Sequence, residues 1–203
     1  MSGFLSNVLQ AVQDPDVAFW DAQTLVVQWG VVIGASLAAA LWDLRTRRIP
    51  NALTAPLFLS GIAWHVWLGG MGGAMDSALG CFVAALPFLI LFLYVGGEAG
   101  DAKMMGAVGA WLGLAQGLVA LVAVVFAGAL LGLGYAVVRK RFYSVLGHVM
   151  AIAMTWTENV RAGKWRGGSA RPLPQVELTE MPYALSILSG ICIAAIGAVL
   201  WQA

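Results

Sequence analysis

Residues 25–42 read LVVQWGVVIGASLAAALW, an apolar run that ends directly at Asp43 and the basic residues behind it. Its length approaches the roughly 20 residues that an α-helix needs to cross a bilayer. The 203-residue chain is 61% hydrophobic and 10% charged, whereas an ordinary soluble domain is about 25% charged. Further apolar runs cover residues 52–68, 77–95, 102–115, 117–138 and 183–201. The sequence therefore predicts an all-α, polytopic (multi-pass) integral membrane protein with about six transmembrane helices.

The boundaries between these runs are marked by residues that interrupt helices. Pro50 precedes the second run, where proline suits a first helical turn, and the glycine-rich linker over residues 69–73 separates the second run from the third. A single helix over residues 102–138 would be about 55 Å long, which is more than a bilayer spans. A tight turn is therefore expected near Gln116.

The chain is predicted to form a single membrane domain over residues 1–203. Residues 1–23 form a short polar segment without Lys or Arg, so the basic start of a cleavable signal peptide is missing and the first span is expected to be retained. Residues 139–181 are the most polar part of the chain. We expect them to form a cytoplasmic loop, with an interfacial helix over residues 142–156.

The distribution of positive charge predicts the orientation. If Asp43 faces the cytoplasm, the alternation of six spans puts all eleven Lys and Arg residues on that side. Both termini then lie in the periplasm, as the positive-inside rule requires. The net charge of +1 gives no reason to expect a nucleic-acid partner.

Two aspartates stand where apolar runs meet charged segments, Asp43 in DLRTRRIPN (residues 43–51) and Asp101 in GEAGDAKM (residues 97–104). A carboxylate at the edge of a membrane span is costly and usually functional. The predicted alternation brings both to one membrane face. Two carboxylates that share a proton supply the base and the acid for peptide hydrolysis without a metal, and they titrate as one coupled unit. The pair is therefore a candidate catalytic dyad.

The pattern Asp-x-Arg-x-x-x-Ile-Pro-Asn over residues 43–51 and the pattern Ala-Gly-Asp-x-Lys over residues 99–103 resemble the two signature segments of the prepilin peptidases, membrane aspartic peptidases of the GxGD type. The resemblance covers nearly the whole chain. It implies that Asp43 and Asp101 are catalytic, without metal or cofactor. It also implies a prepilin or pseudopilin substrate whose short basic leader is cut before its hydrophobic helix, at the cytoplasmic face of the bacterial inner membrane. Membrane lipid is the other expected partner.

Residues beside the two aspartates are expected to bind substrate or shape the site: Arg45, Asn51, Gly97, Glu98, Gly100 and Lys103. The glycines allow a substrate backbone to approach Asp101, and the basic side chains of Arg45 and Lys103 limit the repulsion within the dyad. Glu98 stands where the GxGD pattern has glycine, so we expect it to alter the titration of Asp101 or the approach of substrate.

The cysteine-bearing N-terminal region of bifunctional prepilin peptidases is not found, so the chain resembles the short Tad-type (Flp pilus) peptidases, with peptidase activity and without N-methyltransferase activity. Three alternatives stay open: a non-catalytic assembly partner, a small proton-coupled transporter, and a membrane peptidase with other substrates. A transporter is expected to hold its carboxylates near the middle of the membrane. The predicted position of the two aspartates at the membrane edge favours hydrolysis.

Overall fold

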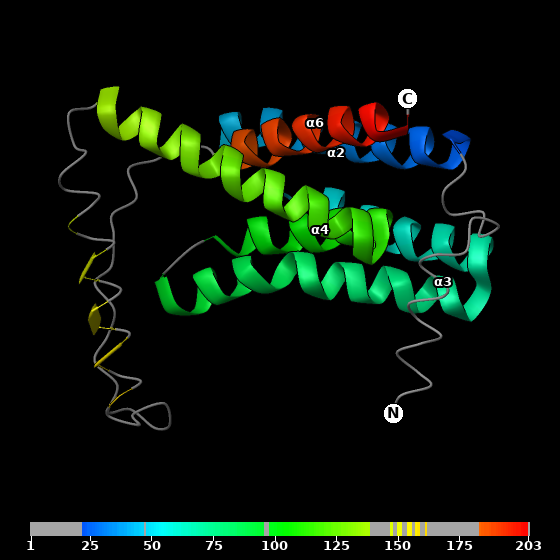
Figure 1. The fold of residues 1–203 in the computed structure, drawn as a ribbon, viewed down its shortest axis with the longest axis horizontal. Coiled ribbons are helices and arrows are strands. Elements are labelled where there is room, and N and C mark those ends of the chain that lie inside the picture. The colour runs from blue at the N-terminus through cyan, green and yellow to red at the C-terminus, as the bar shows by residue number, and fades with distance from the viewer. Residues whose placement is uncertain are drawn as a thin grey trace.

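The computed structural model describes residues 22–46, 48–95, 98–138 and 183–202, together with scattered helical positions from Gly147 to Arg161. The continuous ranges form the helices α2 (Ala22–Thr46), α3 (Asn51–Val95), α4 (Ala99–Val138) and α6 (Tyr183–Gln202), shown in Figure 1. Stretches long and apolar enough to cross a membrane are Thr24–Thr46, Asn51–Leu93 and Ala99–Tyr135, and a shorter apolar helix covers Tyr183–Ala198. The prediction of an all-α membrane protein is confirmed.

Helix α3 reverses direction at Gly70, which has a backbone φ of 57° inside the helix. This left-handed region is readily adopted by glycine. His65 Nδ1 lies 3.5 Å from Asp76 Oδ2, although eleven residues of a straight helix would separate the two positions by about 16 Å. The chain therefore folds back within the predicted linker over residues 69–73, and α3 consists of two antiparallel halves (Figure 1).

Helix α4 reverses in the same way at Gly113, where φ is 70°. A Cβ atom on Gly117 would lie 3.6 Å from the Cα atom of Gly109, whereas eight residues of straight helix span about 12 Å. The expected turn near Gln116 is thus displaced by three residues, because a glycine takes the left-handed conformation at low cost. Gln116 itself is buried and helical.

The two reversals divide α3 and α4 into four segments, which with α2 and α6 make six helical segments in the continuously described ranges. Six membrane crossings and periplasmic termini stay predictions. Residues 1–21, Gly97 and most of the predicted loop 139–181 lie outside the described residues. Within the expected interfacial helix, the described positions Gly147, Met150 and Met154 are helical.

Close backbone contacts join the segments around α4. Helix α3 packs most extensively on α4, and α6 packs on α4 and α2. A Cβ atom on Gly80 would overlap the backbone of Gly109, so glycine lets α3 and α4 approach closely, as small residues do between membrane helices. Large side chains buried below 2% exposure fill the centre, among them Met104, Met105 and Ile187. The first half of α4 is therefore the core of the bundle.

Candidate active site

Asp43 lies in the last turn of α2, because the helix continues to Thr46 rather than ending at Trp42 as the apolar run suggested. Thr46 Oγ1 donates hydrogen bonds to the carbonyl oxygens of Trp42 (3.0 Å) and Arg48 (3.1 Å) at this helix end. The neighbours of Asp43 along the helix are exposed, whereas Asp43 itself is only 6% exposed. Its carboxylate therefore belongs to the inner face of the bundle.

Asp101 lies in the first turn of α4, which begins at Ala99. It is 8% exposed and continues into the buried face formed by Met104 and Met105. Glu98 precedes the helix and is exposed. The second predicted carboxylate is therefore also held inside the bundle, while the extra acidic residue beside it reaches solvent.

Two contacts hold the Asp43 segment and the Asp101 segment together. Ile49 is buried in the connection between α2 and α3, and a Cβ atom on Gly100 would lie 3.3 Å from the Cβ atom of Ile49. Lys103 Nζ donates a 3.0 Å hydrogen bond to Asn51 Oδ1 at the start of α3. Residues 49–51 of the first motif thus pack against residues 100–103 of the second.

The charges of Glu98 and Asp43 both act on the Asp101 carboxyl group, so the two predicted catalytic residues lie within electrostatic range of each other. Burial and a neighbouring like charge both favour a state in which a carboxyl pair holds one proton. In the described part of the chain, neither Asp43 nor Asp101 forms a hydrogen bond or an ion pair through its side chain. Their oxygens are therefore free to bind water or substrate.

The other predicted site residues fall into two groups. Asn51, Gly100, Lys103 and Glu98 lie beside Asp101 through the contacts above, whereas Arg45 is exposed on α2 and forms no ion pair with either aspartate among the residues that are described. Lys103 binds Asn51, so moderation of the repulsion within the dyad by the charges of Arg45 and Lys103 stays a prediction. No group of three or more His, Cys, Asp or Glu side chains in the described ranges is arranged to hold a metal ion.

Tyr183, the first residue of α6, was not among the predicted site residues. The negative charge of Asp101 acts on its hydroxyl group, and its ring packs edge-on against Phe88 with centroids 5.9 Å apart. A Cβ atom on Gly128 would lie 2.9 Å from the Tyr183 hydroxyl oxygen, so this glycine makes room for the phenol. The Met-Pro-Tyr sequence at residues 181–183 was the available signal.

A second polar cluster lies at the other end of the first half of α4, about 18 Å from Asp101 along the helix. Asp76 Oδ1 accepts a 3.0 Å hydrogen bond from the backbone N–H of Leu114, directly after the break at Gly113. The ring of His65 is 1% exposed, and its Nε2 atom lies 3.0 Å from the carbonyl oxygen of Trp111 and 3.4 Å from Gln28 Nε2. These side chains bind backbone groups released by the helix break, as unwound membrane segments require.

Residues 30–133 match the type IV leader peptidase family, a range that includes both aspartates. A prepilin leader peptidase/N-methyltransferase of Aeromonas hydrophila is 29% identical over 158 residues, which cover 68% of this chain and 54% of that protein. A protein of the same name from Burkholderia pseudomallei (strain K96243) is 35% identical over 106 residues, covering 49% and 34%. The chain thus spans about half the length, or less, of these relatives. No solved structure matches it significantly.

Proposed function

The chain belongs to the type IV leader peptidase family, and from this premise we propose that it is an aspartic endopeptidase that cleaves the leader peptides of type IV, Flp-like prepilins. Asp43 and Asp101 are the proposed catalytic dyad. The observation that carries the proposal is the burial of both carboxylates at one end of the bundle, within range of each other's charge.

The proposed reaction needs one proton shared by the two carboxyl groups. The ionised carboxylate accepts a proton from water as the water oxygen attacks the scissile carbonyl carbon, and the protonated partner donates to the carbonyl oxygen. The carbon–nitrogen bond then breaks: one hydroxyl group of the tetrahedral intermediate returns its proton to the ionised carboxylate as the carbonyl re-forms, and the amine leaves with the proton held by the other carboxyl group. The pair again holds one proton at the end of the cycle.

The orientation of the proposed enzyme follows from charge. With the Asp43 and Asp101 end at the cytoplasmic face of the inner membrane, every Lys and Arg of the chain lies on the cytoplasmic side, as the positive-inside rule favours. Arg45, Arg48 and Lys103 are exposed at this end, where they suit the headgroups of anionic lipids. Accessibility of single cysteines to a membrane-impermeant thiol reagent tests the orientation.

The names of the two relatives combine a leader peptidase and an N-methyltransferase, and they describe those proteins. The proposal for this chain concerns only the cleavage of the leader. The Flp-like preference rests on the resemblance to short Tad-type peptidases. It is tested by offering an Flp-type prepilin, another type IV prepilin and a pseudopilin in parallel. Preferential cleavage of the Flp-type protein supports the preference, and equal cleavage of all three contradicts it.

The experiment that tests the proposed function follows cleavage of a co-expressed Flp-type prepilin as a shift in electrophoretic mobility. The wild type is expected to release the leader, and Asp43→Asn and Asp101→Asn are each expected to abolish release. Asparagine preserves the shape of the side chain but cannot exchange the proton. Both variants must be recovered from the membrane fraction in wild-type amounts.

The opposite results are equally informative. Normal cleavage by either variant removes that residue from the dyad. A wild type that cuts none of the three substrates, while correctly inserted, contradicts the peptidase proposal and favours a non-catalytic assembly partner.

A further inference from the structure

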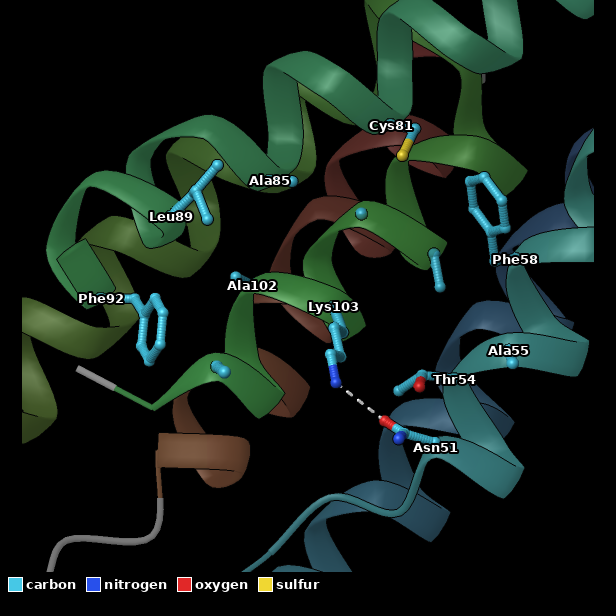
Figure 2. Close-up of a pocket in the computed structure, with 13 residues that line it drawn as sticks. Asn51, Thr54, Ala55, Phe58, Cys81, Ala85, Leu89, Phe92, Ala102 and Lys103 are labelled. Atoms are coloured by element: carbon cyan, nitrogen blue, oxygen red, sulfur yellow. Dashed lines mark hydrogen bonds between the residues drawn. The ribbon is translucent and has the colours of Figure 1, made fainter.

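A cavity of about 680 Å³ is lined by both halves of α3 and by the start of α4 (Figure 2). Its volume is within the roughly 300–1,000 Å³ of typical ligand sites. Along the second half of α3 the lining extends from Cys81 to Phe92, which is about 16 Å of helix. Leu89 and Phe92 on this wall are exposed, so the cavity opens to the surroundings of the bundle, which are lipid for a membrane-embedded protein.

The cavity lies on a different face of α4 from the proposed dyad. Neither Asp43 nor Asp101 is among its lining residues, and Lys103, which does line it, is about 200° around the helix from Asp101. Its α4 side is formed by Ala99, Ala102, Lys103, Gly106 and Ala107. A ligand in this cavity is therefore separate from the proposed catalytic site.

Three polar side chains gather at one end of the cavity, and each has an unused hydrogen-bond donor. Lys103 can only donate, so its 3.0 Å hydrogen bond places the Asn51 oxygen toward it and leaves the two amide N–H groups of Asn51 unused. Thr54 lies one turn further along α3 and is only 5% exposed, yet its hydroxyl group forms no hydrogen bond within the described residues. Figure 2 shows Lys103 and Thr54 on either side of the Asn51 side chain. Buried polar groups are normally hydrogen-bonded, so these donors indicate a missing acceptor.

The character of the lining defines the ligand that would supply this acceptor. An ammonium group, an amide and a hydroxyl together favour anionic oxygens, such as those of a phosphate group. The exposed charges of the adjoining residues 48–51 and 98–103 are Arg48, Lys103 and Glu98, so cations are in the majority there. The remaining walls carry apolar side chains, among them Phe58 and Leu89. The ligand thus combines a phosphate-like group at one end with a hydrocarbon body.

We propose that the cavity binds one phospholipid molecule, with its phosphate group on Lys103, Asn51 and Thr54 and an acyl chain along the apolar walls. In the proposed orientation these donors lie at the cytoplasmic surface of the membrane, where anionic headgroups attract basic residues. The inference goes beyond the proposed function, because lipid binding does not depend on peptide cleavage. Asn51 belongs to the segment that follows Asp43, and Lys103 follows Asp101, so a bound phosphate also links the segments that carry the two aspartates.

The test is photocross-linking of the full-length protein, purified in dodecyl maltoside, with a phosphatidylglycerol that carries a diazirine in one acyl chain. The probe is added at a few molecules per protein molecule, and mass spectrometry of the peptides locates the label. We expect labelling around Phe58, Cys81 and Leu89 in the cavity, well above that of Leu130 and Ile196, which are exposed elsewhere on the bundle.

Competition identifies which part of the lipid is recognised. Unlabelled phosphatidylglycerol is expected to prevent labelling of the cavity. Diacylglycerol, which has the acyl chains but no phosphate, and inorganic phosphate, which has no chain, are each expected to leave the labelling unchanged at the same concentration.

Variants test the two parts of the site separately. Lys103→Met is expected to lower labelling of the cavity by about tenfold or more, and Thr54→Val, which keeps the shape of the side chain, by about threefold or more. Arg45→Gln is the control for charge, because it removes an exposed cation that does not line the cavity. Ala85→Phe fills the apolar part and is expected to lower labelling, whereas Ala78→Phe, at an exposed position of the same half of α3, is not.

Thermal unfolding supplies a second readout that shows whether each variant is folded. Phosphatidylglycerol binds only the folded site, so it is expected to raise the unfolding midpoint of the wild type and of Arg45→Gln. The midpoint of Lys103→Met is expected to rise less. Equal rises in all three proteins would contradict binding of the phosphate at Lys103.

Other results would overturn the inference. Equal labelling of cavity and control positions would mean that no lipid is held there, as would be found if a protein segment occupied the cavity. Equal competition by diacylglycerol would show a hydrocarbon site without phosphate recognition, and displacement by inorganic phosphate would show an ion site only. Cleavage of a prepilin enters none of these measurements, so failure of the proposed function is a separate result.

Discussion

The first half of α4 carries a polar cluster at each end, and the two clusters use their hydrogen-bonding atoms differently. Around Gly113, Asp76 accepts the Leu114 N–H, and the buried His65 ring lies against a backbone carbonyl, Gln28 and Asp76. Around Asp101, the two buried carboxylates make no such contacts within the described residues. The polar side chains around Gly113 are used within the protein, whereas the Asp43 and Asp101 carboxylates keep their hydrogen-bonding capacity for a molecule that is not part of the chain.

This difference in hydrogen bonding distinguishes polar side chains that stabilise a membrane protein from polar side chains that are available for a reaction. Ionisable residues inside a membrane are costly and are retained for a reason. Where polar side chains contact backbone groups at a helix break, as Asp76 contacts the Leu114 N–H and His65 contacts the Trp111 carbonyl oxygen, that reason is the stability of the break. Where largely buried carboxylates form no hydrogen bond or ion pair within the described residues, the proposed catalysis would supply the reason. The following predictions test this division, from the largest expected effect to the smallest.

Asp43→Asn and Asp101→Asn are each expected to lower kcat by on the order of 10³-fold or more, because both members of an acid–base pair are needed in the same step. The unfolding midpoint in detergent is expected to stay the same or to rise, because a buried, unpaired charge is removed. Activity and thermal unfolding are measured on the same preparation. A large loss of stability in either variant would show that this aspartate stabilises the fold, as the side chains around Gly113 do.

Asp76→Ala is expected to give the opposite pattern. It removes the acceptor of the Leu114 N–H and a neighbour of His65, which costs about 1–3 kcal/mol of unfolding free energy, while the activity per folded molecule is retained. Asp76→Asn is the control, since its amide oxygen still accepts the bond and the loss should be less than half as large. Abolished activity with unchanged stability would contradict the division.

Gly113→Ala is expected to destabilise the fold by about 1–2 kcal/mol, the cost of a left-handed conformation for a residue with a Cβ atom. The added methyl group would also overlap the Asp76 carboxylate. Gly134→Ala is the matched control on the same helix: nothing lies within 4 Å of its added Cβ atom, so a gain of up to about 1 kcal/mol is expected. Equal effects at both glycines would show that the break at Gly113 does not determine stability.

Glu98→Gln is expected to change kcat/KM by less than about fivefold, because exposed charges are screened by water and salt. Glu98 is exposed, although its charge acts on Asp101. This variant therefore tests whether Glu98 takes part in the reaction or only lies near Asp101. A loss as large as that of Asp101→Asn would place Glu98 in the catalytic set and make the dyad a triad of carboxylates.

The class of the protein and the identity of its candidate dyad were predictable from the sequence alone. Apolar run length is a local property, and each helix satisfies its own backbone within the run, so the α-helical membrane class and the start of α6 at Tyr183 followed directly. The aspartates stood out because charge is rare in such runs. The position of Asp43 within the last turn of α2 was missed, since hydropathy falls before the helix ends.

Only the tertiary structure decided which distant segments meet. The contacts of Ile49 with Gly100 and of Lys103 with Asn51 join residues about fifty positions apart. A hydropathy profile describes neighbouring residues only and does not indicate which distant residues come into contact. The reversal at Gly113 rather than near Gln116 depends on Asp76 and His65, which reach it from α3. The cavity of about 680 Å³ that is lined by both halves of α3 and by the start of α4 likewise exists only where these distant segments pack together. Composition and spacing are local quantities, whereas a site is made by the packing of residues remote in the chain.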